Sequence, residues 1–289
     1  MEWSTGELGS SVEVTRGVVD TSAYRDMAKG PVEFLPFVGS SSLHNSVARG
    51  LHADAEASAL LHSEPSPGTA VLSLDAVPSD LMLRPEPTVV HGVTEQWRGT
   101  DLWDSEAALL KNFAGVRMDL TSDLSMTVAE YLEYAARTTA DFPYYIYERE
   151  FMGDSAKIAS AFVAPPWVEE DLLEIVPELT PRKCQQLFLL GGSRTGSQLH
   201  ADGHANVGWN VCCFGTKRWV FLAPDTDVSA LGLDHCLEGP ALWFVDKLPL
   251  LRTLAAEGKI HMCECIQKPG DLVLIPHGWY HAIVNLEAS

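Results

Sequence analysis

The sequence predicts a mainly β protein with flanking helices, arranged as an antiparallel sandwich or jelly roll. Between residues 185 and 287, seven short apolar stretches of strand length follow one another, separated by turns that contain Gly or Pro. Strands of this length and this density of turns are typical of such a fold, and we expect the helices to pack outside it. The seven stretches are QQLFLLGG, GSQLHAD, GWNVCCFG, KRWVFLAP, HMCECIQ, DLVLIP and WYHAIVNLE.

Residues 1–85 carry no motif, and we expect a small helical lead-in or a partly disordered segment. Residues 41–64 have helix-forming composition, which the EPSPG stretch at 64–68 interrupts because Pro and Gly break helices. The texture changes from Pro85 onward, so we assign residues 86–289 to one β domain.

Further elements are predicted around this series of strands. PTVVHGVTEQW indicates a short buried strand that ends at a Gly turn, and DFPYYIYEREF is aromatic and favours a strand. Residues 123–138 predict a helix because Val128, Tyr131, Leu132 and Ala135 share one face. Helices are also predicted over 165–179, where a Pro stands near the start, and over 248–258.

Charge and composition limit the partners. The chain has 39 acidic and 20 basic residues, and this net charge of -19 disfavours binding to a nucleic-acid backbone. It favours a Lys/Arg-rich protein partner, although an acidic surface that only maintains solubility gives the same composition. We find no apolar run of membrane-spanning length and no signal peptide, and therefore expect an intracellular protein, nuclear or cytoplasmic. The sequence indicates no oligomeric state.

The six cysteines are expected to be reduced, because Cys212 and Cys213 are adjacent and no secretion signal is present. One alternative metal site uses them. His261, Cys263 and Cys265 in HMCEC share one face of a strand and would suit zinc, but neither a fourth ligand nor a C-x-x-C pair accompanies them.

The stretches GSQLHAD and WYHAIVNLE predict a metal site. His200 and Asp202 are two residues apart, so their side chains project from the same face of a strand. His281 on a late strand is the preferred third ligand, because the alternatives His204 and His277 fall in predicted loops. Two histidines and one carboxylate occupy one face of an octahedral Fe(II) and leave three positions for substrate and O2.

Lys217 begins the strand KRWVFLAP, and a lysine buried there needs an anionic partner. With iron present, the economical partner is the far carboxylate of a 2-oxoglutarate whose other end chelates the metal. Hydrogen bonds to this co-substrate are expected from Asn210, Ser197, Tyr145 and Asn285. Without the neighbouring metal ligands, we would expect a lysine next to a turn to be exposed to solvent.

These residues resemble the Jumonji-C group of Fe(II)/2-oxoglutarate oxygenases, and within it the branch of the bifunctional arginine demethylase and lysyl hydroxylase, formerly called a phosphatidylserine receptor. The resemblance runs from about Pro87 to the C-terminus. Its specificity lies in the combined spacing: an Asn ten residues after the first His, a Lys seven further on, and the motif GW-x-H-x-x-x-N. It implies a double-stranded β-helix, the cupin-like form of the jelly roll.

For function, the resemblance implies Fe(II) as cofactor, with 2-oxoglutarate and O2 as co-substrates. The implied reaction is oxidative decarboxylation of 2-oxoglutarate coupled to hydroxylation of an aliphatic C–H bond in a protein, lysyl hydroxylation first. The same attack on an N-methyl carbon would be demethylation. No side chain beyond the metal centre is implied as an acid or base. The implied metal ligands are His200, Asp202 and His281, and the co-substrate pocket would consist of Lys217, Asn210, Ser197, Tyr145 and Asn285.

The sequence also departs from the family. GHANVG follows Asp202, where relatives tend to have Pro and small residues. The sequence ends eight residues after His281, where relatives continue into one more strand, so the resemblance leaves open whether the last strand is present. Two other interpretations are a catalytically inactive Jumonji-C-like binding module and a cupin with another divalent metal, which would leave Lys217 without a role.

Overall fold

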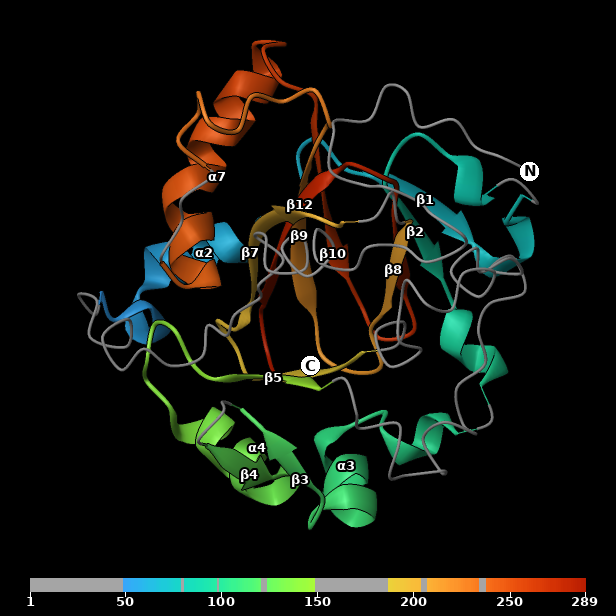
Figure 1. Cartoon of the computed structure of the whole chain (residues 1–289), viewed down its shortest axis with the longest axis vertical. Helices are drawn as coiled ribbons and strands as arrows, with labels where there is room; N and C mark the ends of the chain where they lie inside the picture. Colours follow the sequence, from blue (N-terminus) through green and yellow to red (C-terminus); the bar gives the residue numbers. More distant parts are fainter. Residues whose placement is uncertain are drawn as a thin grey trace, which may run out of the picture.

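Two four-stranded sheets face each other and helices lie outside them (Figure 1). The structure is a computed structural model that describes residues 49–78, 81–97, 99–120, 124–148, 187–203, 207–233 and 238–289. One sheet has the strand order β1-β2-β11-β8, and the other has the order β10-β9-β12-β7. Two smaller pairs, β3-β4 and β5-β6, accompany them. The predicted fold class, a mainly β jelly roll with flanking helices, is confirmed.

Each of the seven stretches predicted in series forms one strand, β6 to β12, and the two strands predicted earlier correspond to β2 and β5. The strands are β1 Ala70–Ser73, β2 Thr88–His91, β3 Arg117–Asp119, β4 Ser125–Thr127, β5 Tyr145–Glu148, β6 Phe188–Gly191, β7 Gly196–Ala201, β8 Gly208–Val211, β9 Lys217–Leu222, β10 Met262–Gln267, β11 Leu272–Ile275 and β12 Tyr280–Asn285. The α-helices are α2 Ala55–Leu61, α3 Glu106–Phe113, α4 Val128–Arg137 and α7 Pro240–Ala256. Short 3-10 helices are η1 Leu51–Ala53, η2 Leu74–Ala76, η3 Leu81–Leu83, η4 Val93–Gln96 and η5 Thr100–Leu102.

The space between the two large sheets is filled by alternate residues of their strands. Trp219 and Phe221 of β9 pack there against Ile283 of β12, and Val89 and Val273 reach it from the facing sheet. Because side chains alternate along a strand, every second residue of β9, β10 and β12 points into this interior. The centre of this interior is therefore apolar. The polar site residues described below also point into it, at particular positions along the strands.

The helix predicted over 123–138 begins later than expected. Ser125–Thr127 pairs with β3 as β4, and the helix α4 starts at Val128. The Thr127 side chain accepts a hydrogen bond from the backbone N–H of Glu130, and the Glu130 carboxylate accepts one from the N–H of Thr127. This reciprocal cap fixes the first turn of the helix.

The helix predicted over 248–258 is longer than expected, because α7 begins at Pro240. Its first two turns are apolar on several sides, with Trp243 and Phe244 both buried, so no amphipathic spacing marks them in the sequence. Pro240 is tolerated in the first turn because its missing N–H would have no partner within the helix. The helix predicted over 165–179 lies outside the described residues.

The described residues before position 86 pack against the sheets. β1 pairs in parallel with β2, and α2 packs against α7 with Ala57 and Leu61 in a shared core cluster. The boundary at residue 85 stays a prediction, and these contacts join residues 51–73 to the β domain.

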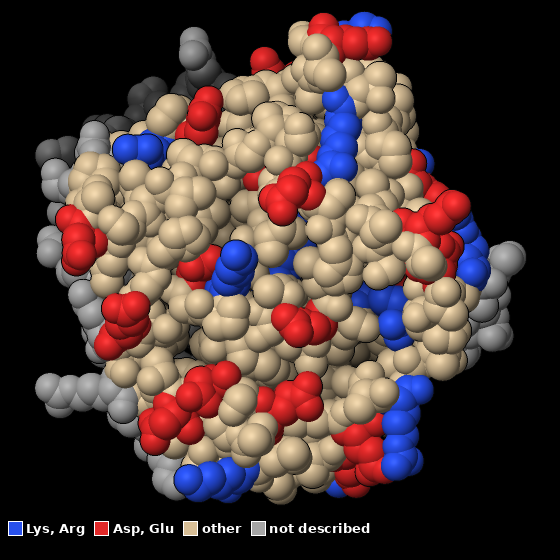
Figure 2. Space-filling model, turned by 180° about the vertical axis from the view of Figure 1, so that it is seen from behind, with Lys and Arg blue, Asp and Glu red and all other residues tan. Residues whose placement is uncertain are grey.

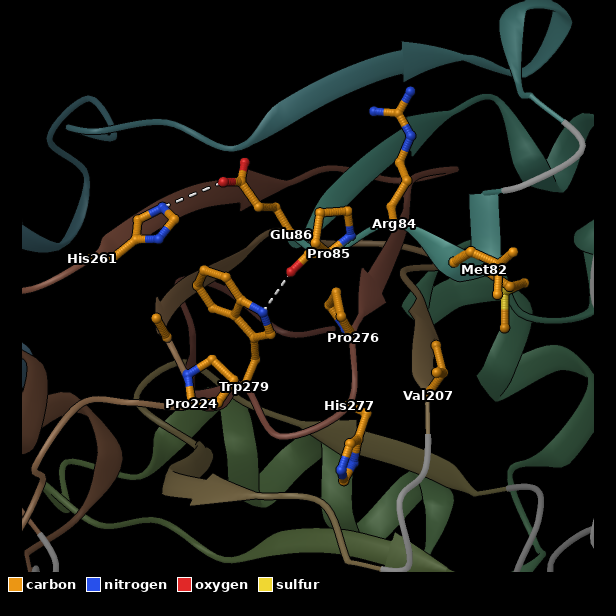
Figure 3. Close-up of a pocket in the computed structure, with 12 residues that line it drawn as sticks. Met82, Arg84, Pro85, Glu86, Val207, Pro224, His261, Pro276, His277 and Trp279 are labelled. Atoms are coloured by element: carbon orange, nitrogen blue, oxygen red, sulfur yellow. Dashed lines mark hydrogen bonds and ion pairs between the residues drawn. The ribbon is translucent and has the colours of Figure 1, made fainter.

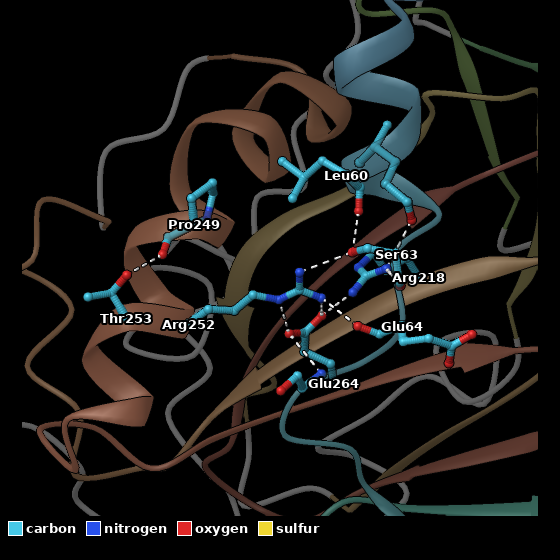
Figure 4. A network of polar contacts seen from close by, with 10 residues as sticks. Leu60, Ser63, Glu64, Arg218, Pro249, Arg252, Thr253 and Glu264 are labelled. Carbon is cyan, nitrogen blue, oxygen red and sulfur yellow. Dashed lines mark hydrogen bonds and ion pairs between the residues drawn. The ribbon is translucent and has the colours of Figure 1, made fainter.

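A buried network of ion pairs and hydrogen bonds also connects residues 61–63 to the β domain (Figure 4). The Glu264 carboxylate, fully buried on β10, accepts hydrogen bonds from Arg218 of β9 and Arg252 of α7. Arg218 also donates to the carbonyl oxygens of Leu61 and Ser63, at 3.0 and 2.7 Å. The network therefore connects strand, helix and N-terminal segment through one carboxylate.

Acidic side chains are spread over the face shown in Figure 2 and do not gather in one patch. No α-helix within the described ranges is both long and apolar enough to cross a membrane.

Candidate metal centre and co-substrate pocket

The three predicted metal ligands converge at one end of β7 and β12. These strands pair antiparallel with His200 opposite His281, so both imidazoles leave the sheet on the same side, and Asp202 follows directly after β7. One ligand atom from each residue lies within 4.8 Å of the other two. Asp202 Oδ1 is 3.7 Å from His200 Nε2 and 3.9 Å from His281 Nε2. His200, His281 and the residues in register with them on β9 and β10, Phe221 and Cys263, are called the metal layer.

Backbone carbonyl groups orient both imidazoles. His200 Nδ1 lies 2.8 Å from the carbonyl oxygen of Gln198, and His281 Nδ1 lies 3.1 Å from that of Trp279. A ring that donates from Nδ1 presents the lone pair of Nε2 as a ligand. Burial, together with the neighbouring His281, lowers the pKa of His200 to about 3, and burial lowers that of His281 to about 4. Both rings are neutral at pH 7, the state that binds a cation.

Asp202 lies close to the facing sheet, where Gly208 begins β8. A Cβ atom on Gly208 would stand 2.7 Å from Asp202 Oδ2, so the missing side chain leaves room for the carboxylate. The Asp202 side chain is 32% exposed and that of His281 is 3% exposed. The ligand cluster is therefore open to solvent on the side of Asp202.

Lys217 is buried on the same inward face, four residues along β9 from the metal layer. It pairs with Asn285 of β12 and is 4% exposed. Its Nζ donates to Asn285 Oδ1 at 3.0 Å and to Ser289 Oγ at 2.6 Å. Burial lowers the pKa of the ammonium, and no carboxylate of the described residues forms an ion pair with it. The predicted burial of this lysine is thus present, with neutral partners.

Asn285, Tyr145 and Thr195 meet at Gly191. The Nδ2 of Asn285 donates to Thr195 Oγ1 at 2.9 Å, and Tyr145 pairs with Gly191 across β5 and β6. A Cβ on Gly191 would lie 2.1 Å from Thr195 Oγ1, 2.4 Å from Asn285 Nδ2 and 2.7 Å from Tyr145 Cδ2. Burial raises the pKa of Tyr145, so its phenol keeps its proton and remains a donor.

Ser197 and Asn210 lie on two further strands that border the interior between the two large sheets. Ser197 is buried on β7 and pairs with Ile283, at a level between the metal layer and Lys217. Asn210 pairs with Val273 in the facing sheet, and its buried Oδ1 has no hydrogen-bond partner among the described residues. All eight predicted site residues therefore lie on strands that border one interior, or directly after such a strand.

The sequence interpretation missed Thr195, Gly208 and Ser289. Thr195 lies in GSRTGSQLHAD, one residue before the strand that carries the first ligand, and that proximity was the available signal. Gly208 offered no signal, because its contact with Asp202 arises only when the two sheets face each other. Ser289 reaches Lys217 because its backbone exchanges two hydrogen bonds with Gly191, each of 2.9 Å.

The alternative ligands are placed differently. His204 lies outside the described residues. His277 lines a cavity beside the metal layer and does not join the cluster. Cys263 and Cys265 both face the interior as buried free thiols, as the same-face placement predicted, and His261 lies 3.6 Å from a Glu86 oxygen. Within the described ranges, the histidine–aspartate–histidine cluster is the one group with metal-binding geometry.

Comparison with known proteins assigns the family. The cupin-like domain family matches residues 121–289, which is more than half of the chain. The chain belongs to this cupin-like family. The resemblance to the Jumonji-C group is also confirmed, because relatives of the cupin-like chain include the bifunctional arginine demethylase and lysyl-hydroxylase of Caenorhabditis elegans, 27% identical over 213 residues. That alignment covers 70% of this chain and 53% of the relative.

Two other relatives carry related names. A lysine-specific demethylase of Arabidopsis thaliana is 25% identical over 217 residues, 71% of this chain and 22% of the relative. A 2-oxoglutarate and iron-dependent oxygenase of Mus musculus is 35% identical over 104 residues, 35% of this chain and 23% of the relative. The cupin-like chain thus spans about half the length of the nematode relative and less of the other two.

Proposed function

We propose that this cupin-like chain is an Fe(II)- and 2-oxoglutarate-dependent dioxygenase that hydroxylates a protein side chain, with lysyl hydroxylation as the leading reaction. One observation carries the proposal. The register of β9 and β12 sets the His/Asp/His cluster and a buried lysine on one inward face, four residues apart, and no carboxylate of the described residues pairs with that lysine. Four strand residues span about 13 Å, a distance that a lysine side chain and a five-carbon diacid can share.

The side chains fit both groups. Two neutral imidazoles and one carboxylate are the ligand set of non-haem Fe(II) and leave coordination positions open. A dicarboxylate would bring one carboxylate to the metal and the other to Lys217, whose buried charge has no carboxylate partner in the described part of the chain. The buried amide oxygen of Asn210, which has no hydrogen-bond partner within the described ranges, would gain one from a ligand or water in the space beside it.

Each residue would have a defined task. His200, Asp202 and His281 would hold the metal, and Lys217 with Asn285 would orient the distal carboxylate. Iron and 2-oxoglutarate, when bound, supply the activation of O2 that couples decarboxylation of the co-substrate to hydroxylation of a C–H bond. The chain positions the reactants and excludes water. The excluding surface is the interior aromatic stack, in which the rings of Trp219 and Phe221 are 5.5 Å apart and those of Trp219 and His281 are 6.0 Å apart.

The substrate class is part of the proposal. A net charge of -19 suits a Lys/Arg-rich protein segment and disfavours nucleic acid as a direct ligand. The names of the relatives include a lysyl-hydroxylase and demethylases of arginine and lysine, and attack on an N-methyl carbon would give demethylation by the same chemistry. An intracellular location, nuclear or cytoplasmic, stays a prediction.

An anaerobic titration tests the proposal. Purified protein receives Fe(II) and then 2-oxoglutarate, and the visible metal-to-ligand charge-transfer band is recorded. We expect a band in the parent protein and in the control variant Lys259→Met, which makes the same substitution at an exposed lysine. His200→Ala should abolish the band and Lys217→Met should weaken it strongly. Absence of any band in the parent would overturn the proposal and favour the non-catalytic binding module.

A further inference from the structure

A cavity of about 490 Å³ opens beyond the metal layer (Figure 3). Trp279, Ala223 and His261 line it, and each stands two residues beyond a member of the metal layer, directly outside the end of β12, β9 and β10 respectively. Because side chains alternate along a strand, these are the next inward-facing positions, one step of about 7 Å outward. The cavity therefore lies at the end of the interior opposite to Lys217.

The facing sheet closes the cavity from the other side. Val207 lines it and directly precedes Gly208, whose backbone borders the Asp202 carboxylate. Continuing the register of β2 and β11 outward brings Glu86 level with Pro276, and both line the cavity. Asp202 is also the most exposed of the three ligands, and Val207 brings the cavity wall to within one residue of the glycine beside its carboxylate.

The rim combines an exposed apolar edge with one carboxylate. Leu83 is 83% exposed, more than any other large hydrophobic side chain of the described residues. Glu86, whose side chain is 58% exposed, lies 3.6 Å from His261 Nε2, and Figure 3 shows this pair above the ring of Trp279. Arg84 extends away from the pair in the same view. The charge presented over the ring is thus that of a carboxylate.

Trp279 gives the cavity a fixed wall. Its indole N–H donates to the carbonyl oxygen of Pro85 at 2.8 Å, and His261 packs edge-on against its ring at 5.3 Å. The hydrogen bond to Pro85 ties β12 to the residues that lead into β2, so the two sheets are joined at the rim. The same tryptophan supplies the carbonyl that orients His281. Trp279 therefore both forms a wall of the cavity and orients the metal ligand His281.

We propose that this cavity is the docking site for the substrate polypeptide, and that Glu86 selects a segment that carries Lys or Arg close to the modified residue. This inference rests on the proposed function and locates its substrate. Leu83 would be covered by the apolar part of the segment, while the Glu86 carboxylate would pair with the neighbouring cation. The volume lies within the range of ligand pockets, roughly 300–1,000 Å³, which suits one or two side chains and not a folded domain.

Fluorescence anisotropy with two labelled peptides tests the inference on the full chain without iron. One peptide of about 15 residues has Lys or Arg at alternate positions, and its matched partner has Glu at those positions. We expect Glu86→Gln to weaken binding of the basic peptide about two- to fivefold, because the carboxylate is exposed, and Glu86→Lys about tenfold or more. Leu83→Ser, at an exposed position that tolerates change, should weaken binding with the charge intact. Glu106→Gln on α3, which removes an equal charge outside the cavity, should leave affinity within twofold.

The outcomes separate this inference from the proposed function. If Fe(II) and 2-oxoglutarate bind but neither position 86 nor position 83 affects peptide affinity, the substrate docks elsewhere and the docking proposal is wrong. Tighter binding of the acidic peptide would overturn it as well. If the basic peptide binds with the expected dependence on Glu86 but iron does not bind, the docking site stands and the catalytic proposal fails.

Discussion

Replacing Lys217 by Met should separate stability from co-substrate binding. The parent ammonium is 4% exposed and is held by two neutral hydrogen-bond acceptors, Asn285 and Ser289. Removing it costs about 1.5–3 kcal/mol for each hydrogen bond from a charged donor, whereas it relieves a desolvation cost of several kcal/mol for an unpaired buried ion. The two effects oppose each other, so the free energy of unfolding of the ligand-free protein should change by less than about 2 kcal/mol.

Binding of 2-oxoglutarate should respond very differently. Leaving its distal carboxylate buried without a cation costs about 3–5 kcal/mol, which weakens affinity by roughly 10²- to 10³-fold or more. At a concentration of 100 times the parent Kd, 2-oxoglutarate stabilises the parent by about 2.7 kcal/mol and should stabilise Lys217→Met by less than about 0.5 kcal/mol.

Anaerobic urea denaturation in the presence of Fe(II), with and without 2-oxoglutarate, measures both quantities. Lys259→Met serves as the control, because this lysine is exposed and contacts only Glu257 among the ion pairs described. The reasoning is refuted if Lys217→Met retains the stabilisation by 2-oxoglutarate. It is refuted equally if the variant loses more than about 4 kcal/mol without ligand, since Lys217 would then be a structural residue.

Three further predictions concern the metal layer and the ion network. Gly208→Ala should lower Fe(II) affinity at least tenfold with little loss of far-UV circular dichroism, because its Cβ would stand 2.7 Å from Asp202 Oδ2, and unchanged affinity in a metal titration would contradict this. Glu264→Gln should lower the free energy of unfolding in urea by about 3–5 kcal/mol, since two arginines would lose their carboxylate, and a loss below 1 kcal/mol would show that the network is dispensable. In the folded protein the pKa values of His200 and His281 are near 3 and 4, below the value of 6.5 for a histidine in the unfolded chain. Both histidines are therefore neutral above pH 6.5 in the folded and the unfolded protein, whereas between pH 6.5 and 4 they bind protons mainly in the unfolded protein. The metal-free protein should therefore lose up to about 1.4 kcal/mol per pH unit per histidine as the pH falls from 6.5 towards 4, and stability that stays flat over this range in denaturation at several pH values would contradict the burial of neutral rings.

The strands of the sandwich could be predicted because each follows a local rule. Alternating or continuous apolar residues between Gly and Pro turns mark β6 to β12 without knowledge of partners. The start of α7 could not be predicted in this way, because Trp243 and Phe244 are buried on neighbouring faces and leave no polar side to give a period. Burial on several sides removes the signal on which the reading of a helix depends.

Contacts between segments that are distant in the chain could not be predicted from the sequence either. The carboxylate of Glu264 gathers Arg218 and Arg252, and the guanidinium of Arg218 binds backbone carbonyls 155 and 157 residues away. Any of these charged residues would be assigned to the surface from its type alone, because charged side chains are seldom buried without a partner. Only the packing of α2 and α7 against the sheet shows that the partners are present.

The position of Ser197 shows why motif and periodicity had to be combined. Ser197 and His200 are three residues apart, so a regular strand would point them to opposite faces. The structure places a β-bulge there: His281 pairs with His200 and Ile283 with Ser197, which is two residues on β12 against three on β7. The extra residue returns Ser197 to the face of the metal ligand, and bulges are known to redirect side chains in this way near active sites. Alternation alone would have excluded Ser197 from the predicted pocket, although the motif analysis included it. The bulge removes this conflict, because it places Ser197 on the face of the metal ligand.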